Sequence, residues 1–166
     1  YIIDTNRDLC IDKTVTSQPN NKGEYTITLD THGVIRNKKV VSDTDIVLIV
    51  DNSSSMQQEI KNLSQYVDSF IEKMLSLNTT EAPSAVRIAV VIFDKTAHNY
   101  FDENKIGTNG FITSYGTAAE NLILNLKCGN GTNTQSGIQT AAELLNKHGR
   151  SSADKYVVLF TDGEPY

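Results

Sequence analysis

One stretch of five apolar residues limits the folds available to this chain more than any other feature. Residues 46–50 read Ile-Val-Leu-Ile-Val and lie between Asp45 and Asp51. A strand with one face in water alternates polar and apolar side chains, so an unbroken β-branched run is typical of a strand buried on both faces, as in a parallel sheet. Two further apolar runs follow at residues 86–93 and 156–160. The sequence therefore predicts a sheet built on three buried strands.

The segments between these strands have the spacing of helices. Apolar residues recur at three- and four-residue steps over residues 56–74, and again over 118–126 and 138–145. Residues 98–101 are a candidate short strand beside the second run. Strands that alternate with helices indicate βαβ units. The predicted fold class is α/β, a Rossmann-like and mostly parallel sheet with helices on both faces.

The first part of the chain, residues 1–43, has a different pattern. Residues 9–16 and 24–30 predict two strands, and the segment 17–23 between them is rich in turn-forming residues. His32 and Gly33 suggest a further turn. This part is predicted to be a short N-terminal antiparallel β segment, which the 166-residue length accommodates beside one larger domain.

Composition and motifs exclude several classes of function. Hydrophobic residues make up 39% of the chain, which is enough for a core. The net charge of -5, without a long basic run, argues against nucleic acid and anionic membranes as partners. No apolar run approaches the ~18 residues of a membrane helix, so direct membrane insertion is not expected. Motifs of serine hydrolases, P-loop enzymes and zinc proteases are absent, which predicts a protein that is not an enzyme.

Three polar segments follow apolar ones where a ligand site is expected. They are Asp-Asn-Ser-Ser-Ser at residues 51–55, Gly-Asn-Gly-Thr-Asn-Thr at 129–134, and Thr-Asp-Gly-Glu at 161–164. Ligands of open α/β sheets bind outside the carboxyl ends of the strands, so these segments can converge. Taken alone, the first segment is more typical of a helix N-cap, since Asp and Ser favour that position.

Together the three segments resemble the von Willebrand factor A family. A buried strand that ends in DxSxSM, a GTNT loop and a strand that ends in TDGE match, in this order, its metal-ion-dependent adhesion site, and the resemblance covers residues 44–166. The family fold continues for two more strand–helix units, so we expect this chain to be a piece that ends before the full domain. The resemblance implies these metal-site residues: Asp51, Ser53, Ser55, Thr132 and Asp162.

The resemblance also implies how such a site works. Mg²⁺ prefers about six oxygen ligands, and Mn²⁺ or Ca²⁺ also accept oxygen. The hydroxyls of Ser53, Ser55 and Thr132 would bind the ion, while Asp51 and Asp162 hold its waters. Because neutral oxygens leave the ion most of its charge, an acidic residue of a partner protein can complete the shell. The expected function is an extracellular, non-enzymatic adhesion module that binds a host receptor or matrix protein.

The N-terminal segment suggests a setting. Residues 12–15 and 25–29 are similar to the segment that precedes such domains in bacterial cell-surface and pilus-tip adhesins. This implies a secreted protein of the cell wall or pilus with a role in virulence. The alternative is an intracellular von Willebrand A-like domain that docks a partner subunit of a chelatase- or ATPase-type machine.

Three local questions stay open at the level of sequence. Cys10 and Cys128 can pair as a disulfide or remain separate thiols. Lys13 lies on a candidate strand, and adhesins of the resembled kind often carry Lys–Asn isopeptide bonds. Most relatives have Gly where this chain has Ser54, so Ser54 would be strained if the position required a positive φ.

Overall fold

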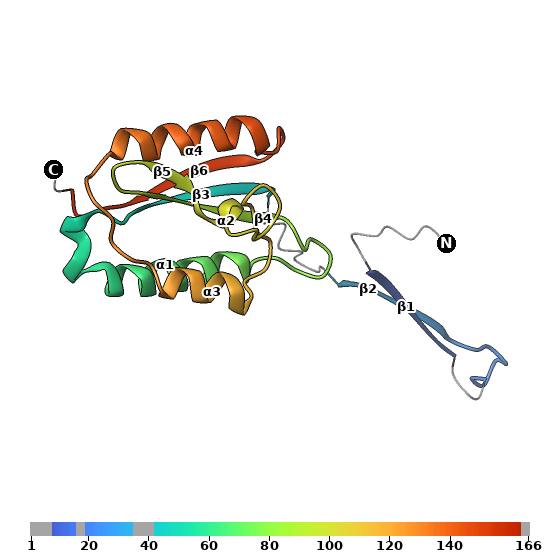
Figure 1. Ribbon diagram of the computed structural model, residues 1–166. Coiled ribbons are helices and arrows are strands. Elements are labelled where there is room, and N and C mark those ends of the chain that lie inside the picture. The colour runs from blue at the N-terminus through green and yellow to red at the C-terminus, as the bar shows by residue number, and fades with distance from the viewer. Residues whose placement is uncertain (1–7, 16–18, 35–41, 164–166) are drawn as a thin grey trace. The chain divides into compact units, whose positions relative to one another are not determined.

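The computed structural model describes residues 8–15, 19–34 and 42–163, and the chain divides into two compact units at residues 40 and 41 (Figure 1). The first unit is a hairpin of β1 (Asp8–Val15) and β2 (Ile27–Val34). The two strands pair antiparallel along their whole length, with Val15 opposite Ile27. The predicted antiparallel β segment at the N-terminus is therefore confirmed.

Two details of the hairpin differ from the sequence prediction. The second strand begins at Ile27 rather than at residue 24, because the Asn20 carboxamide oxygen accepts the backbone N–H groups of Lys22 and Glu24 and holds these residues in the turn. His32 and Gly33 form no turn, since both lie inside β2, opposite Cys10 and Leu9. Their turn-forming character is outweighed by pairing with β1.

The described part of the second unit is made of strands that alternate with helices. The strands are β3 (Thr44–Asp51), β4 (Val86–Phe93), β5 (Ala97–Asn99) and β6 (Asp154–Phe160). The helices are η1 (Ser54–Gln58), α1 (Ile60–Leu75), α2 (Tyr100–Glu103), α3 (Thr117–Leu124) and α4 (Thr134–His148).

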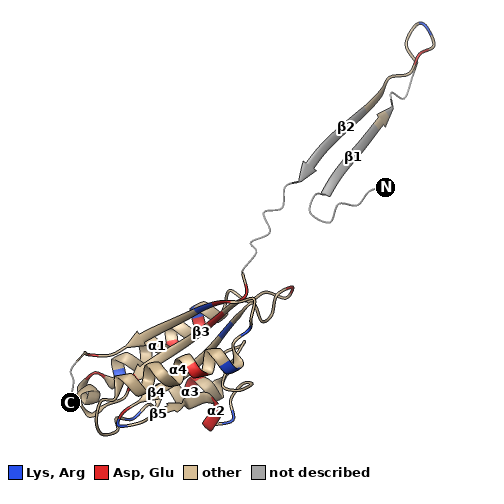
Figure 2. Cartoon of the chain, turned by 90° about the horizontal axis from the view of Figure 1, so that it is seen from above, with Lys and Arg blue, Asp and Glu red and all other residues tan. Residues whose placement is uncertain are grey.

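The four strands form one sheet in the order β5-β4-β3-β6. The central strand β3 is parallel to β4 and to β6, and the short β5 is antiparallel to β4. Helices α1 and α3 cover one face of the sheet and α4 covers the other (Figure 1), so that α4 lies in front of the strands when the unit is seen from above (Figure 2). The α/β, mostly parallel fold is confirmed.

The core lies on both faces of β3. Residues 46–50 are buried without exception, as the unbroken apolar run predicted. Leu48 and Val50 pack into the layer under α1 and α3, and Val47 and Ile49 pack into the layer under α4. This double burial fixes the register of β3, and it fixes the position of the polar turn that follows.

Strand β6 is less buried than its apolar sequence predicted. Tyr156 is 55% exposed and Val157 is 49% exposed. The reason is its place in the sheet, because within the described residues β6 pairs with β3 on one side and stands at the edge. Among the same residues, no helix combines the length and the apolar character needed to cross a membrane.

Candidate metal site

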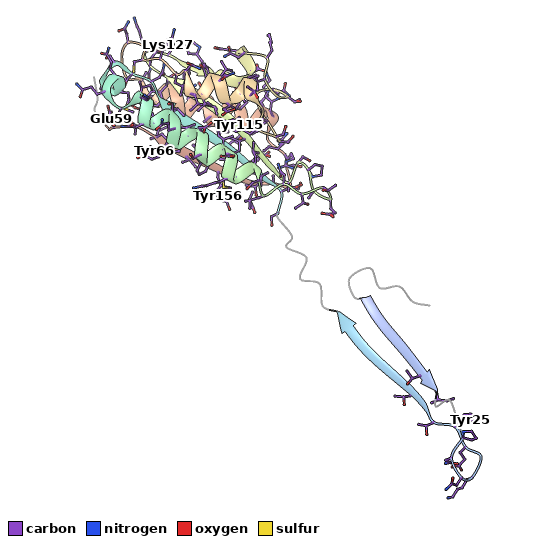
Figure 3. The ribbon with its side chains drawn as sticks, turned by 90° about the horizontal axis from the view of Figure 1, so that it is seen from below. Tyr25, Glu59, Tyr66, Tyr115, Lys127 and Tyr156 are labelled. Carbon is purple, nitrogen blue, oxygen red and sulfur yellow. The ribbon has the colours of Figure 1, made fainter. Side chains whose placement is uncertain are left out.

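The predicted site residues lie at the carboxyl edge of the three parallel strands. Strand β3, which ends at Asp51, lies between β4 and β6, so its last residue has a strand end on either side. Figure 3 places Glu59, which follows η1, and Lys127, which follows α3, at this same end of the unit. Segments that are distant in the sequence therefore end in the same region of the unit.

The turn after β3 directs two hydroxyl groups toward each other. The Asp51 Oδ1 atom accepts the backbone N–H of Ser53 at 2.9 Å, and the Oγ atoms of Ser53 and Ser55 are 2.9 Å apart. Ser53 occupies the N-cap position of η1, yet its side chain makes no capping hydrogen bond. The simple interpretation of this segment as a helix cap does not account for the paired hydroxyls.

Ser54 is not strained. It is the first residue of η1, and among the described residues the non-glycine positions with positive φ are Lys105 and Asn109. The serine that replaces the usual glycine therefore leaves the turn intact.

The end of β6 is tied to Asp51 by a residue that sequence reasoning missed. The hydroxyl of Thr161 donates to Asp51 Oδ2 at 2.7 Å and accepts the N–H of Gly163 at 3.0 Å. Asp162 lies between these two residues, with an exposed side chain. Thr161 thus holds the third polar segment against the first.

The middle loop is tied to the same turn by Asn52. The Asn52 carbonyl accepts the N–H of Gly129 at 2.6 Å, and its carboxamide donates to the Lys127 carbonyl at 3.2 Å. Farther along the loop, the N–H of Asn133 donates to the Asp94 carbonyl, at the end of β4, at 2.6 Å. These bonds hold the loop that contains Thr132 over the strand ends. The side-chain role of Asn52 was not foreseen from the sequence.

Two buried oxygens in this region have no hydrogen-bond partner among the described residues. They are the hydroxyl of Thr132 and the carboxamide oxygen of Asn52. A buried polar atom without a partner costs about 1–3 kcal/mol, so such atoms are rare without a function. The hydroxyl of Thr132 fits the role of a ligand to a cation.

The electrostatic surroundings of Asp51 are clearest in comparison with those of Asp45, which lies at the other end of β3. Both side chains are fully buried. Asp45 accepts hydrogen bonds from Arg87 at 2.7 and 2.8 Å and from Arg150 at 2.9 Å. Burial raises the pKa of Asp45, but the bonds from the two arginines outweigh it and hold the pKa below its ordinary value. Asp51 forms no ion pair with a described Lys, Arg or His, so two neutral donors face its charge.

The donors around Asp51 suit a hard cation. The described residues contain no group of three His, Cys, Asp or Glu side chains placed to hold a metal. The available ligands are instead hydroxyls supplemented by carboxylates, and oxygen ligands are those that Mg²⁺, Mn²⁺ and Ca²⁺ prefer.

Burial and the negative charge of Asp51 both raise the pKa of the nearby Cys128 thiol, which keeps the thiol neutral. Cys128 is a free thiol in the structure. The questions of a Cys10 disulfide and a Lys13 isopeptide bond concern side chains outside the described residues.

The profile of the von Willebrand factor type A domain matches residues 46–164, which is most of the chain. The chain belongs to this family. The match spans all three polar segments around Asp51, so the domain fold and the predicted site fall within one family region.

Similar proteins include a bacterial pilus subunit. The minor fimbrium subunit Mfa5 of Porphyromonas gingivalis is 30% identical over an alignment of 149 residues that covers 87% of this chain and 11% of Mfa5. A crystal structure of three N-terminal domains of this type V pili tip protein matches with a TM-score of 0.66 at 26% identity, covering 96% of this chain and 27% of that one. The structure of its vWF domain matches with a TM-score of 0.61 at 27% identity, covering 76% and 40%.

A more distant match concerns the fold alone. Proximal thread matrix protein 1 from the mussel byssus, solved with a zinc-occupied MIDAS motif, has a TM-score of 0.50 at 24% identity and covers 76% of this chain and 31% of that one. The chain is similar to the vWF domain of a pili tip protein, and it spans a small part of the curated relative that it matches.

Proposed function

We propose that this chain is the ligand-binding domain of a bacterial surface adhesin, which holds a divalent cation and binds a partner protein through a carboxylate. The proposed metal-site residues are Asp51, Ser53, Ser55, Thr132 and Asp162. Family membership and similarity to a pilus-tip protein support an adhesive, non-enzymatic role at the cell surface. The match to the three-domain structure extends over 96% of the chain, which favours an adhesin over an intracellular docking domain.

The observation that carries the proposal is that the fully buried carboxylate of Asp51 has two neutral hydrogen-bond donors and no described cationic side chain beside it. An ionised carboxylate that is fully buried is costly unless an opposite charge or several hydrogen bonds face it. The protein supplies two arginines to Asp45 and no described cationic side chain to Asp51. A bound cation is the simplest source of the missing positive charge.

The residues around the cation would then have two different roles. The hydroxyls of Ser53, Ser55 and Thr132 would serve as neutral ligands, while Asp51 and Asp162 accept hydrogen bonds from waters on the ion. When bound, the cation supplies a strong positive charge to which a partner carboxylate coordinates. Mg²⁺ is the proposed ion, and Mn²⁺ or Ca²⁺ are chemically acceptable substitutes.

Thr132→Val tests the metal site with little risk to folding. The Thr132 hydroxyl makes no hydrogen bond to a described residue, and Val has nearly the same shape. We expect isothermal titration and Mn²⁺ electron paramagnetic resonance to show a loss of metal affinity of about tenfold or more. Thr117→Val, at the exposed start of α3, is the matched control and should bind Mn²⁺ normally. Equal affinity in the two variants would refute the assignment of Thr132.

Partner binding is tested on an immobilised basement-membrane extract. We expect the wild-type chain to bind the extract in Mg²⁺ and to lose this binding in EDTA. The Thr132→Val variant should not bind the extract even in Mg²⁺. Binding that is insensitive to the chelator would refute the carboxylate bridge, even if the cation itself binds.

A further inference from the structure

We propose that Lys95 makes this site selective for a partner segment with two acidic groups, one for the cation and a second for a pocket beside it. The inference rests on the proposed function and names the chemistry of the partner. Lys95 was not singled out from the sequence.

The backbone of Lys95 is held against the loop that contains Thr132. Lys95 lies in the turn after β4, where the N–H of Asp94 donates to the Thr96 carbonyl at 3.0 Å. Gly131 lies directly against it, since a Cβ atom there would be 3.3 Å from both Cα and Cβ of Lys95. On the other side of Thr132, Asn133 donates through its backbone to the Asp94 carbonyl and through its carboxamide to the Lys95 carbonyl, at 2.6 and 3.4 Å. Both neighbours of Thr132 therefore contact the Asp94–Lys95 turn.

A pocket of about 460 Å³ opens at this junction. Thr132, a proposed ligand of the cation, also lines the pocket, so a partner that reaches the ion lies beside it. No acidic side chain lines the pocket. Its lining consists of Lys95, Gly131, Thr132, Asn133, Thr134 and Gln135.

The charge of the pocket favours an anion. Lys95 is exposed and forms no ion pair with a described residue. Thr134 and Gln135 belong to the first turn of α4, whose 15 residues direct the positive end of the helix dipole toward the pocket. The ammonium group of Lys95 has no free electron pair, so it cannot serve as a metal ligand. Its charge instead adds to that of the ion and attracts a second carboxylate.

The test compares acetate with glutarate on the Mn²⁺-loaded chain. Binding is followed by the paramagnetic broadening of the ligand proton signals, which detects weak ligands near the ion. We expect glutarate to bind more tightly than acetate to the wild type. Lys95→Gln should lower the glutarate affinity about two- to fivefold more than the acetate affinity, as expected for an exposed ion pair. Lys95→Arg should keep the preference, because it keeps the charge.

Two controls distinguish a failure of the Lys95 proposal from a failure of the proposed metal site. Lys147→Gln removes the same charge from the last turn of α4, at the opposite end of the unit, and should leave the glutarate preference unchanged. The Mn²⁺ affinity of Lys95→Gln should equal or exceed that of the wild type. If Lys95 only held the loop in place, its loss would instead lower the Mn²⁺ affinity. If Mn²⁺ binds but the acetate-to-glutarate ratio is the same in the wild type and Lys95→Gln, the role of Lys95 is refuted. If Mn²⁺ does not bind the wild type, the proposed function itself fails.

Discussion

The substitution Asp51→Asn is expected to stabilise the metal-free protein and to remove the stabilisation that Mg²⁺ provides. Asn keeps an oxygen that can accept the Ser53 N–H, and its amide can donate to the Thr161 hydroxyl. The bond from Ser53 is therefore kept and the bond to Thr161 is reversed in direction, while the buried negative charge is removed. The same substitution at Asp45 has the opposite expectation, because there the charge holds Arg87 and Arg150 in place.

The magnitudes follow from these contacts. Burying an uncompensated ion costs several kcal/mol, and the two hydrogen bonds to Asp51 already offset part of that cost, so we expect Asp51→Asn to raise the free energy of unfolding by about 1–2 kcal/mol in EDTA. A cation at one hundred times its dissociation constant stabilises the wild type by about 2.7 kcal/mol. The order of stability should therefore reverse when Mg²⁺ is added. Asp45→Asn should cost about 3–5 kcal/mol under both conditions, since it breaks a buried ion pair.

Urea unfolding followed by circular dichroism, in EDTA and in saturating Mg²⁺, measures all three proteins. The reversal is the decisive result. A loss of stability for Asp51→Asn in EDTA as large as that for Asp45→Asn would show that the protein itself compensates the Asp51 charge. A wild type that gains nothing from Mg²⁺ would show that the missing charge is not supplied by this ion.

Three further outcomes are expected from the same structure. The folded-state pKa of Asp45 lies below its ordinary value near 3.8, so its contribution to stability should be present above about pH 4 and lost as the pH falls through the folded-state pKa. In urea titrations at acidic pH, the free energy of unfolding of Asp45→Asn should therefore depend less on pH than that of the wild type. Asn52→Ala removes the bond to the Lys127 carbonyl and should weaken Mn²⁺ binding about tenfold in calorimetry, with a stability loss near 1 kcal/mol. Gly129→Ala would place a methyl group against the Asp94 carboxylate, and it should lower the thermal midpoint by an amount that corresponds to about 1–3 kcal/mol.

The parts of the fold that were predictable depend on local pattern. The five-residue apolar run correctly predicted that β3 is buried on both faces, because such a run leaves no polar face for water. The exposure of β6 was not predictable in this way, since burial of a strand depends on what lies beside it. His32 and Gly33 were misassigned for a related reason: pairing with β1 outweighs the local preference for a turn.

The candidate site shows the same division between local and long-range features. Asp51, Ser53 and Ser55 fall within one short motif, so sequence alone could propose them. Thr161 could not be found by such reasoning, because its function is a hydrogen bond to a residue 110 positions away. The same holds for Asn52, whose carboxamide reaches across 75 positions to the middle loop. The one sequence signal for both is that each stands next to a motif residue.

The two ends of β3 together explain why a motif alone is weak support for a metal. A buried aspartate ends the apolar run on either side, and by burial alone Asp45 and Asp51 are equivalent. Their partners separate them, since two guanidinium groups reach Asp45 whereas a backbone N–H and a hydroxyl reach Asp51. A structural aspartate and a metal-site aspartate therefore differ in the charge that faces them. That difference makes the comparison of Asp51→Asn with Asp45→Asn informative about function as well as stability.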